Sequence, residues 1–161
     1  MKNVYFYETS IGKILIAEDG IGVTNLSLQQ EVLDVNLQEH IAFEYEMHET
    51  ERIKEAAKQL TEYLSGNRKE FTVKLNPKGT VFQMQVWDAL RKIPYGETRS
   101  YKQIAEDISN IKACRAVGMA NHNNPIMVMI PCHRVIGANG SLVGYGGGLQ
   151  MKDQLLQLER A

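Results

Sequence analysis

Residues 100–123, SYKQIAEDISNIKACRAVGMANHN, decide how the second half of this chain folds. Ser100 and Gln103 form a capping-box pattern, which predicts that a short helix begins at YKQIAEDI. The stretch ISNIK separates that helix from ACRAVGMANHN, which is also compatible with a helix. Two short helices with a tight link resemble a helix-turn-helix, although two ordinary packed helices explain the pattern equally well.

The residues on either side of this segment predict further elements. Upstream, Thr80 and Gln83 repeat the capping-box pattern, and apolar residues at helical spacing after them predict a helix that ends at Pro94. Downstream of Pro125, the apolar run IMVMI predicts a strand that leads into PCHRV. A glycine-rich stretch, ANGSLVGYGGG, and a helix, KDQLLQLE, follow.

The first half of the chain has a different pattern. VYFYET, GKILIAE and VTNLSL alternate as strands do, and Asp19-Gly20 is a hairpin-turn signal, so a small antiparallel sheet is expected. Apolar residues at helical spacing between Glu49 and Leu64 predict one amphipathic helix. Residues 67–79 read as a strand followed by a connection between two parts of the chain.

Length and composition are those of a folded globular protein. The chain has 161 residues, enough for two small domains, and we expect an α+β fold with domains at residues 1–78 and 79–161. Neither a signal peptide nor a membrane span is expected, because no run of eighteen apolar residues occurs. The two cysteines, Cys114 and Cys132, support no disulfide framework, which favours a reducing, cytoplasmic compartment.

The charge distribution says more than the net charge. The formal net charge of −1 argues against the strongly basic surface of a non-specific nucleic-acid binder. Basic residues nevertheless gather between Lys92 and Arg115, while many acids lie between Glu39 and Glu55. The sequence therefore predicts a local basic face on the C-terminal half.

Cys132 is the candidate nucleophile. Pro131 restricts the backbone before it, an apolar run leads into it, and His133 follows it with a possible base. A buried structural thiol explains Cys132 about as well from the spacing alone. Adjacent residues in an extended chain point to opposite sides, so either a turn or a water must connect the two side chains. Asp153 and Glu159 are the acidic candidates for orienting His133, and spacing does not choose between them.

Three stretches carry a family resemblance: GTVFQMQVWDALRKIPYGETRSYKQIAEDI, CRAVGMANHNNP and IPCHRVIGANGSLVGYGGGLQMKDQLLQLE. They resemble the O6-alkylguanine-DNA alkyltransferases, also called methylated-DNA–protein-cysteine methyltransferases, over residues 79–159. The resemblance implies a ribonuclease H-like N-terminal domain and a C-terminal winged helix-turn-helix-like domain that carries the active site. It also implies a DNA-repair protein that moves an alkyl group from O6-alkylguanine, and from O4-alkylthymine as a second substrate, to itself.

The resemblance assigns the catalytic roles. Cys132 matches the alkyl acceptor, which forms a thioether by direct displacement, so each molecule reacts once and needs no cofactor. His133 and Glu159 match a water-linked relay that draws the thiol proton. Asn124 matches the residue that braces the turn ahead of the active-site strand.

The resemblance also assigns the groups that bind the base. Tyr101 matches a phenol that donates to the guanine ring, and the backbone N–H of Gly146 matches the donor to O6. The carbonyls of Cys132 and Val135 match those that read the exocyclic amine. Tyr145 matches the wall of the pocket.

Double-stranded DNA is the implied partner, bound by a monomer. A base inside a duplex cannot present its O6 substituent to a thiol, so the nucleotide must rotate out. Arg115 matches a finger that fills the space left behind, although a solvated surface arginine is the commoner role of such a residue. Ala116 and Gly118 offer the small surface that entry into the minor groove requires, and Arg134 is assigned to DNA binding as well.

The chain departs from the family pattern in a few places. DISNIK lacks the usual Gly-x-Pro between the two helices, and Cys114 is read as an apolar filler. No metal site is expected, and His40 and His48 are read as surface residues. Two other classes stay open: a non-catalytic alkyltransferase-like binding module, which lacks the acceptor cysteine, and a helix-turn-helix transcription factor, which leaves PCHRV unexplained.

Overall fold

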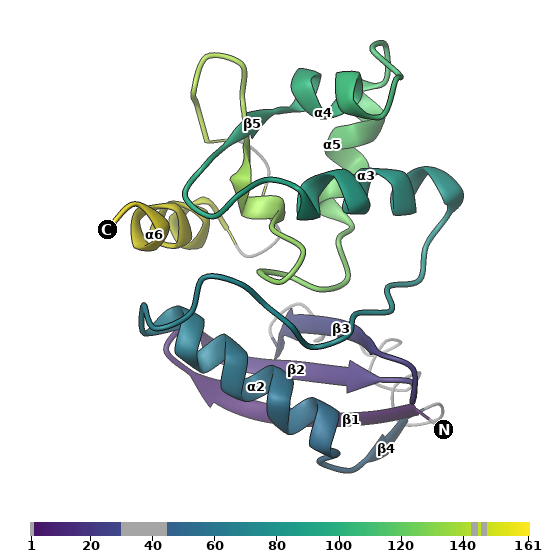
Figure 1. The fold of residues 1–161 in the computed structure, drawn as a ribbon, viewed down its shortest axis with the longest axis vertical. Coiled ribbons are helices and arrows are strands. Elements are labelled where there is room, and N and C mark those ends of the chain that lie inside the picture. Colours follow the sequence, from purple (N-terminus) through teal and green to yellow (C-terminus); the bar gives the residue numbers. More distant parts are fainter. Residues whose placement is uncertain (1, 30–44, 143–144, 146–147) are drawn as a thin grey trace. The chain divides into compact units, whose positions relative to one another are not determined.

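The computed structural model describes residues 2–29, 45–142, 145 and 148–161, which divide into two compact units, Met1–Lys78 and Gly79–Ala161 (Figure 1). The first unit holds β1 (Lys2–Thr9), β2 (Gly12–Glu18), β3 (Val23–Leu28), β4 (Tyr45–Met47) and α2 (Glu51–Leu64). The second holds α3 (Val81–Arg91), β5 (Arg99–Ser100), α4 (Tyr101–Asp107), α5 (Cys114–His122), η2 (Cys132–Arg134), β6 (Val135–Ile136) and α6 (Leu149–Arg160). The α+β class expected from the sequence is confirmed.

The sheet of the first unit has the order β3-β2-β1-β4. The three predicted strands pair antiparallel, from Asn3 opposite Glu18 to Thr9 opposite Gly12 between β1 and β2. The fourth strand, β4, pairs parallel to β1, so the expectation of a purely antiparallel sheet is corrected. With three residues, β4 is too short to show the alternation that marks a strand in a sequence.

Helix α2 lies across one face of the sheet, as Figure 1 shows. Thr50 caps its first turn by accepting a hydrogen bond from the backbone N–H of Ile53, which satisfies one of the free donors at a helix start. Side chains alternate along a strand, so β2 contributes to both faces. Leu15 and Ala17 join a cluster with Val4, while Ile14 and Ile16 point to the opposite face.

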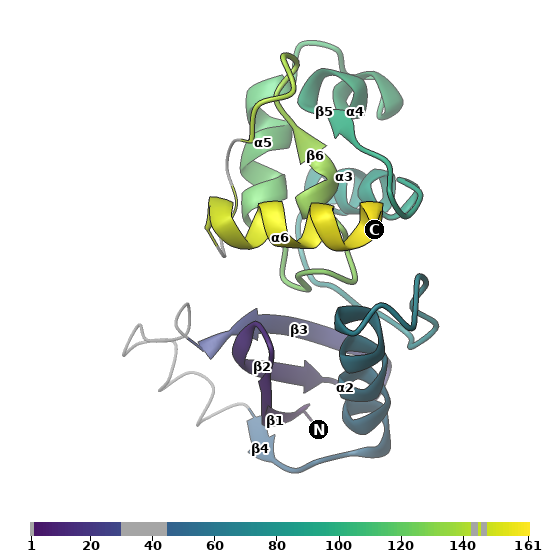
Figure 2. The ribbon, with the colours of Figure 1, turned by 90° about the vertical axis from the view of Figure 1, so that its left-hand side faces the viewer.

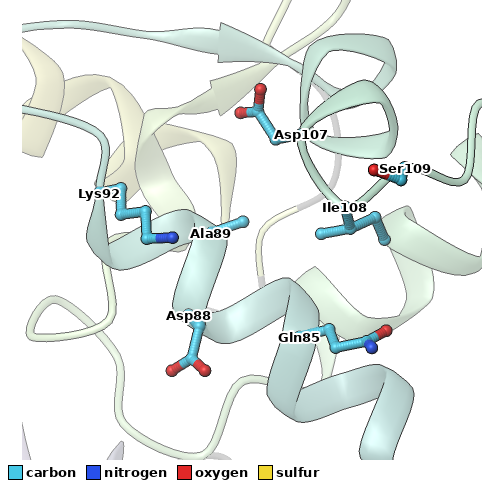
Figure 3. Close-up of a pocket in the computed structure, with 7 residues that line it drawn as sticks. All are labelled: Gln85, Asp88, Ala89, Lys92, Asp107, Ile108 and Ser109. Carbon is cyan, nitrogen blue, oxygen red and sulfur yellow. The ribbon is translucent and has the colours of Figure 1, made fainter.

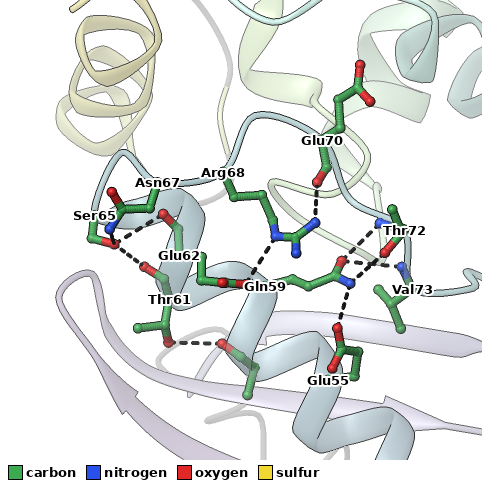
Figure 4. A network of polar contacts seen from close by, with 11 residues as sticks. Glu55, Gln59, Thr61, Glu62, Ser65, Asn67, Arg68, Glu70, Thr72 and Val73 are labelled. Atoms are coloured by element: carbon green, nitrogen blue, oxygen red, sulfur yellow. Dashed lines mark hydrogen bonds and ion pairs between the residues drawn. The ribbon is translucent and has the colours of Figure 1, made fainter.

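Gln59 explains why the segment after α2 is not the predicted strand (Figure 4). The Gln59 side chain is buried, and its Oε1 accepts hydrogen bonds from the backbone N–H groups of Thr72 (2.9 Å) and Val73 (3.3 Å). A side chain therefore takes the place of a neighbouring strand for these two residues. An isolated bridge, Val23 to Leu75, connects the segment with the sheet.

Helices α3 and α4 begin where the sequence predicts, whereas α6 begins at Leu149, three residues before the predicted KDQLLQLE. At α3 the Thr80 and Gln83 side chains cap each other's backbone N–H, and at α4 Ser100 and Gln103 do the same. The buried Trp87 donates its indole N–H to the carbonyl of Ala120 at 2.9 Å, which joins α3 to α5. Figures 1 and 2 show α6 beside the short turn η2, so the last helix packs against the segment that contains PCHRV.

Candidate active site

The apolar run that precedes Cys132 forms a buried turn, and the prediction of a strand at IMVMI is wrong. Its backbone bonds within itself, from Ile130 N–H to Ile126 O at 3.0 Å and from Met129 N–H to Met127 O at 2.8 Å. Val128 has a φ of 68°. A β-branched residue in this left-handed region is strained by about 1–3 kcal/mol, so the surrounding packing must hold the turn in place.

The side chain of Asn124, which precedes the turn, closes it with two hydrogen bonds to its backbone. Its Oδ1 accepts from the N–H of Ile126 at 3.0 Å, and its Nδ2 donates to the carbonyl of Ile130 at 2.8 Å. One side chain thus joins the first and last residues of the turn. The backbone N–H of Cys132 in turn donates to the same Ile130 carbonyl at 2.7 Å, so Asn124 is two hydrogen bonds away from the candidate nucleophile.

Cys132, His133 and Arg134 form one turn of 3-10 helix, in which the N–H of Arg134 bonds to Pro131 O at 3.0 Å. The chain is therefore not extended here. The cysteine is 5% exposed and the histidine 0% exposed, so both side chains lie inside the unit. Because the chain turns here, the side chains of Cys132 and His133 need not point to opposite sides, as they would in an extended strand.

The His133 imidazole is bonded to Glu159, with 2.6 Å between Nε2 and Oε2. Asp153, the other acidic candidate, instead accepts from Gln157 on the exposed side of α6. Burial lowers the pKa of His133 below its usual value, outweighing the opposite effect of Glu159. The imidazole is therefore neutral at neutral pH, and since a carboxylate only accepts, the proton sits on Nε2 and the lone pair on Nδ1.

Arg134 holds the same carboxylate from the other side. Its Nε donates to Glu159 Oε1 at 2.8 Å, its Nη2 to Oε2 at 3.0 Å, and its Nη1 to the carbonyl of Ile93 at 2.7 Å. The arginine is 7% exposed and its guanidinium lies over the ring of Tyr95. It could reach a phosphate only by breaking these bonds, so the predicted role of Arg134 in DNA binding is withdrawn.

Tyr101, the first residue of α4, lies close to the cysteine. Burial raises the pKa of the Tyr101 phenol, and the negative charge of Cys132 raises it further, while a hydrogen bond with Asn121 acts in the opposite direction. A phenol with a raised pKa keeps its proton and can donate it in a hydrogen bond. Gly118 faces the same ring, since a Cβ built on it would lie 3.8 Å from the Tyr101 ring.

Asn121 and Lys152 are site residues that the sequence did not single out. Asn121 is buried on α5, where its Nδ2 is 3.4 Å from the carbonyl of Cys132. Its burial beside Val117 and Ala120 follows helical spacing, which is the signal that could have found it. Lys152 lies fully buried near the start of α6, where a lysine would ordinarily be assigned to solvent.

The other predicted base-binding residues are only partly described. Val135 is completely buried in β6, opposite Arg99 of β5. Tyr145 is half-buried, and its carbonyl accepts from the N–H of Gly148 at 3.0 Å. Gly146 lies outside the described residues.

The residues predicted to meet DNA lie at the start of α5. Arg115 and Ala116 are exposed, and Gly118 is half-buried against Tyr101. Ala116 is small and directly follows Arg115, while the buried side of α5 carries Val117, Ala120 and Asn121. The exposed face of α5 therefore carries Arg115 with the small Ala116 next to it, and Met119 one turn further along.

A separate cavity of about 540 Å³ contains none of the predicted site residues (Figure 3). It is lined by Gln85, Asp88, Ala89, Lys92, Asp107, Ile108 and Ser109. The described part of the chain has no group of three side chains suited to a metal ion, and no helix in it is long and apolar enough to cross a membrane. His48 is exposed, and His40 lies outside the described residues.

Two family models match the chain. Residues 81–161 match the DNA binding domain of 6-O-methylguanine DNA methyltransferase, and residues 4–77 match the ribonuclease-like domain of the same protein. These descriptions agree with the two kinds of domain that the resemblance implied.

Curated relatives are similar over nearly the whole chain. The methylated-DNA–protein-cysteine methyltransferase of Methanosarcina acetivorans is 48% identical over 155 residues, covering 95% of each chain. The constitutive enzyme of that name from Bacillus subtilis is 47% identical over 154 residues, covering 95% of this chain and 92% of the relative. A crystal structure of Mycobacterium tuberculosis OGT in complex with DNA is 42% identical, with a TM-score of 0.87 over 98% of this chain and 92% of that one.

Proposed function

The chain belongs to the methylated-DNA–protein-cysteine methyltransferase family and is a DNA-repair protein that transfers alkyl groups to a cysteine of its own, and on this premise we propose that Cys132 is the acceptor and O6-alkylguanine the substrate. O4-alkylthymine is a second substrate of the same chemistry. The observation that carries the proposal is the buried set of Cys132, His133 and Glu159, in which the imidazole next to the thiol is bonded to a carboxylate at 2.6 Å. A structural cysteine needs no such partner.

The reaction is a direct displacement at the alkyl carbon. A bond forms between that carbon and Sγ of Cys132, the bond from the carbon to O6 of guanine breaks, and the electron pair leaves with the base. The nucleophile, the base and the leaving-group donors are all protein groups, so the step requires no cofactor. The thioether has no good leaving group and no reductant reverses it, so each molecule reacts once.

The thiol proton passes to His133. With Nε2–H donating to Glu159, the Nδ1 lone pair is the basic position of the ring, reached from the thiol directly or through one water. Arg134 and the N–H of Gly96, at 3.2 Å from Oε1, hold the Glu159 carboxylate in place. The basic tautomer of His133 is therefore set before any substrate arrives.

The base pocket supplies hydrogen bonds to the leaving guanine. Tyr101 donates from its phenol, a role supported by its place beside Cys132 and by its raised pKa. The N–H of Gly146 donates to O6, the carbonyls of Cys132 and Val135 accept from the exocyclic amine, and Tyr145 forms the wall. These donors spread the charge that develops on the base as the alkyl carbon leaves it.

The partner is double-stranded DNA that contains the alkylated base, bound by a monomer in the cytoplasm. The exposed Arg115 enters the stack when the nucleotide rotates out, and Ala116 and Gly118 let α5 approach the minor groove. The match of residues 81–161 to a DNA binding domain supports this part of the proposal.

Mass spectrometry after incubation with duplex DNA that contains O6-methylguanine tests the proposal. We expect one added methyl group on the intact protein and, after digestion, the methyl on Cys132. Cys132→Ser should abolish transfer, because a hydroxyl is a far weaker nucleophile at neutral pH, whereas Cys114→Ser should transfer normally. A methyl group on Cys114, or a non-catalytic protein that binds the DNA and gains no mass, would contradict the proposal.

A further inference from the structure

Asn121 is a buried amide on α5 that the reaction described above does not use. Its side chain is 2% exposed and lies on the buried side of the helix, with Val117 and Ala120. Burying an amide costs free energy unless its polar atoms find hydrogen-bond partners. The partners of Asn121 therefore indicate what this side chain does.

The first partner is the backbone of the candidate nucleophile. Nδ2 of Asn121 lies 3.4 Å from the carbonyl oxygen of Cys132, which is longer than a usual hydrogen bond. A carbonyl only accepts, so the amide nitrogen faces it and the amide oxygen does not. The same carbonyl also accepts from the N–H of Val135, so the turn at Cys132 does not depend on Asn121 alone. The contact with Cys132 thus fixes the orientation of the Asn121 amide.

The second partner is the phenol of Tyr101. The Tyr101 ring lies against α5, where a Cβ built on Gly118 would be 3.8 Å from it, and Asn121 follows Gly118 by about one helical turn. Burial raises the pKa of the Tyr101 phenol, and the hydrogen bond with Asn121 acts to lower it. A hydrogen bond that favours the phenolate is one that the phenol oxygen accepts, so an amide N–H of Asn121 donates to it. Nδ2 carries two N–H groups, which suffice for both partners.

The amide oxygen of Asn121 has no comparable contact. It is buried and has no hydrogen-bond partner within the described ranges of the chain. A buried acceptor of this kind destabilises the folded protein. The donors of the side chain thus meet groups of the site, while its acceptor gains nothing. An apolar side chain of the same size would serve stability at least as well, so the useful property of this amide is its donors.

We propose that Asn121 directs the phenol proton of Tyr101 toward the base that occupies the pocket. A phenol oxygen both accepts and donates hydrogen bonds. Because Asn121 presents an N–H to this oxygen, it does not receive the phenol proton, which can therefore be donated to the leaving guanine. Asn121 acts through Tyr101 and exchanges no atom with the substrate, so it is a positioning residue. This role rests on the donor role of Tyr101 in the proposed function.

The contacts that set this direction run through three elements. The carbonyl of Cys132 on η2 orients the amide of Asn121 on α5, and the amide orients the phenol of Tyr101 at the start of α4. With the amide reversed, its oxygen would face the phenol and would accept the proton that the base requires. The backbone of the nucleophile thereby sets the direction of the donor that assists the leaving group.

The first test compares Asn121→Leu, which is similar in size but has no polar atoms, with Asn123→Leu at the exposed end of α5 as the matched control. The substrate is the free base O6-benzylguanine, which requires no DNA binding. We expect Asn121→Leu to react about tenfold more slowly, while its melting temperature does not fall because the buried acceptor without a partner is gone. Asn123→Leu should keep the original rate. An original rate in Asn121→Leu would overturn the proposal.

The second test is a double-mutant cycle with Tyr101→Phe, which removes the phenol oxygen and keeps the ring. If Asn121 acts through the phenol, adding Asn121→Leu to Tyr101→Phe should change the rate by less than about twofold. Equal slowing by Asn121→Leu with and without the phenol would mean that Asn121 supports the site in another way, and would overturn the proposal.

A third measurement needs no variant of Asn121. In NMR spectra of the isotope-labelled protein, Tyr101→Phe should shift the side-chain amide protons of Asn121, because one of their acceptors is lost. Unshifted signals would overturn the proposal.

Two outcomes concern the proposed function. Peptide mapping of Asn121→Leu after the reaction should find the benzyl group on Cys132, and a benzyl group on another residue would overturn the proposed function. An unchanged rate in Tyr101→Phe alone would remove the donor role of Tyr101 and, with it, the role of Asn121.

Discussion

Replacing Asn124 with alanine should loosen the turn that carries Cys132. The Asn124 side chain joins Ile126 N–H (3.0 Å) to Ile130 O (2.8 Å), and that carbonyl also receives the N–H of Cys132. The turn contains a strained residue, Val128, with a φ of 68°. Asn124 is therefore one of the contacts that keep an unfavourable backbone conformation in place.

The size of the effect follows from the two hydrogen bonds. The bond to the Ile130 carbonyl is worth about 0.5–1.5 kcal/mol net, because that carbonyl keeps the N–H of Cys132, whereas the Ile126 N–H loses its acceptor at a cost of about 1–3 kcal/mol. Asn124 itself is only half-buried, so water can reach part of the gap, and the lower part of the combined range applies. We expect Asn124→Ala to lower the free energy of unfolding by about 1.5–3 kcal/mol.

Urea unfolding followed by circular dichroism measures this difference. Asn123→Ala is the matched control, because the neighbouring Asn123 is exposed and should change the free energy of unfolding by less than about 0.5 kcal/mol. Asn124→Asp should fall between the two, since a carboxylate can accept from Ile126 but cannot donate to Ile130. A loss below about 0.5 kcal/mol in Asn124→Ala would refute the reasoning.

Three further predictions concern the reaction. Arg115→Ala should slow repair of duplex DNA about tenfold or more and leave the reaction with free O6-benzylguanine unchanged. Quenched-flow assays with both substrates measure this difference, and equal slowing of both would place Arg115 in the active site. Glu159→Gln should lower the reaction rate with both substrates, because Arg134 and His133 lose the charge that orients them. An unchanged rate with the free base would exclude the proton relay. Methylation should lower the melting temperature of the protein, measured by calorimetry at neutral pH, because an added methyl group in a packed site commonly costs about 1–3 kcal/mol. A melting temperature that rises after the reaction would contradict this.

Local features of the fold could be predicted because they depend on residues a few positions apart. The capping boxes at Thr80 and Ser100 involve a partner three residues later, and both form as expected. The hairpin strands follow from alternation, and α2 follows from helical spacing. The cysteine-histidine pair is likewise visible as two adjacent letters.

Tertiary contacts decided the rest. IMVMI has the composition of a strand, but its backbone hydrogen bonds run within the segment, and Asn124 closes it as a turn. Gln59 similarly satisfies Thr72 and Val73 with a side chain where a strand was expected. Composition sets which segments are buried, but the partner of each backbone group is chosen in three dimensions.

The sequence by itself determined the family and the α+β class and singled out Cys132 and His133 as candidates, since these rest on residue types and short-range spacing. The tertiary structure decided that Arg134 binds Glu159, 25 residues away, and Ile93, 41 residues away, instead of DNA. It also placed Lys152 of α6 inside the protein. The physical reason is that burial of a charge depends on which distant groups surround it, and α6 acquires these neighbours only when it packs against η2.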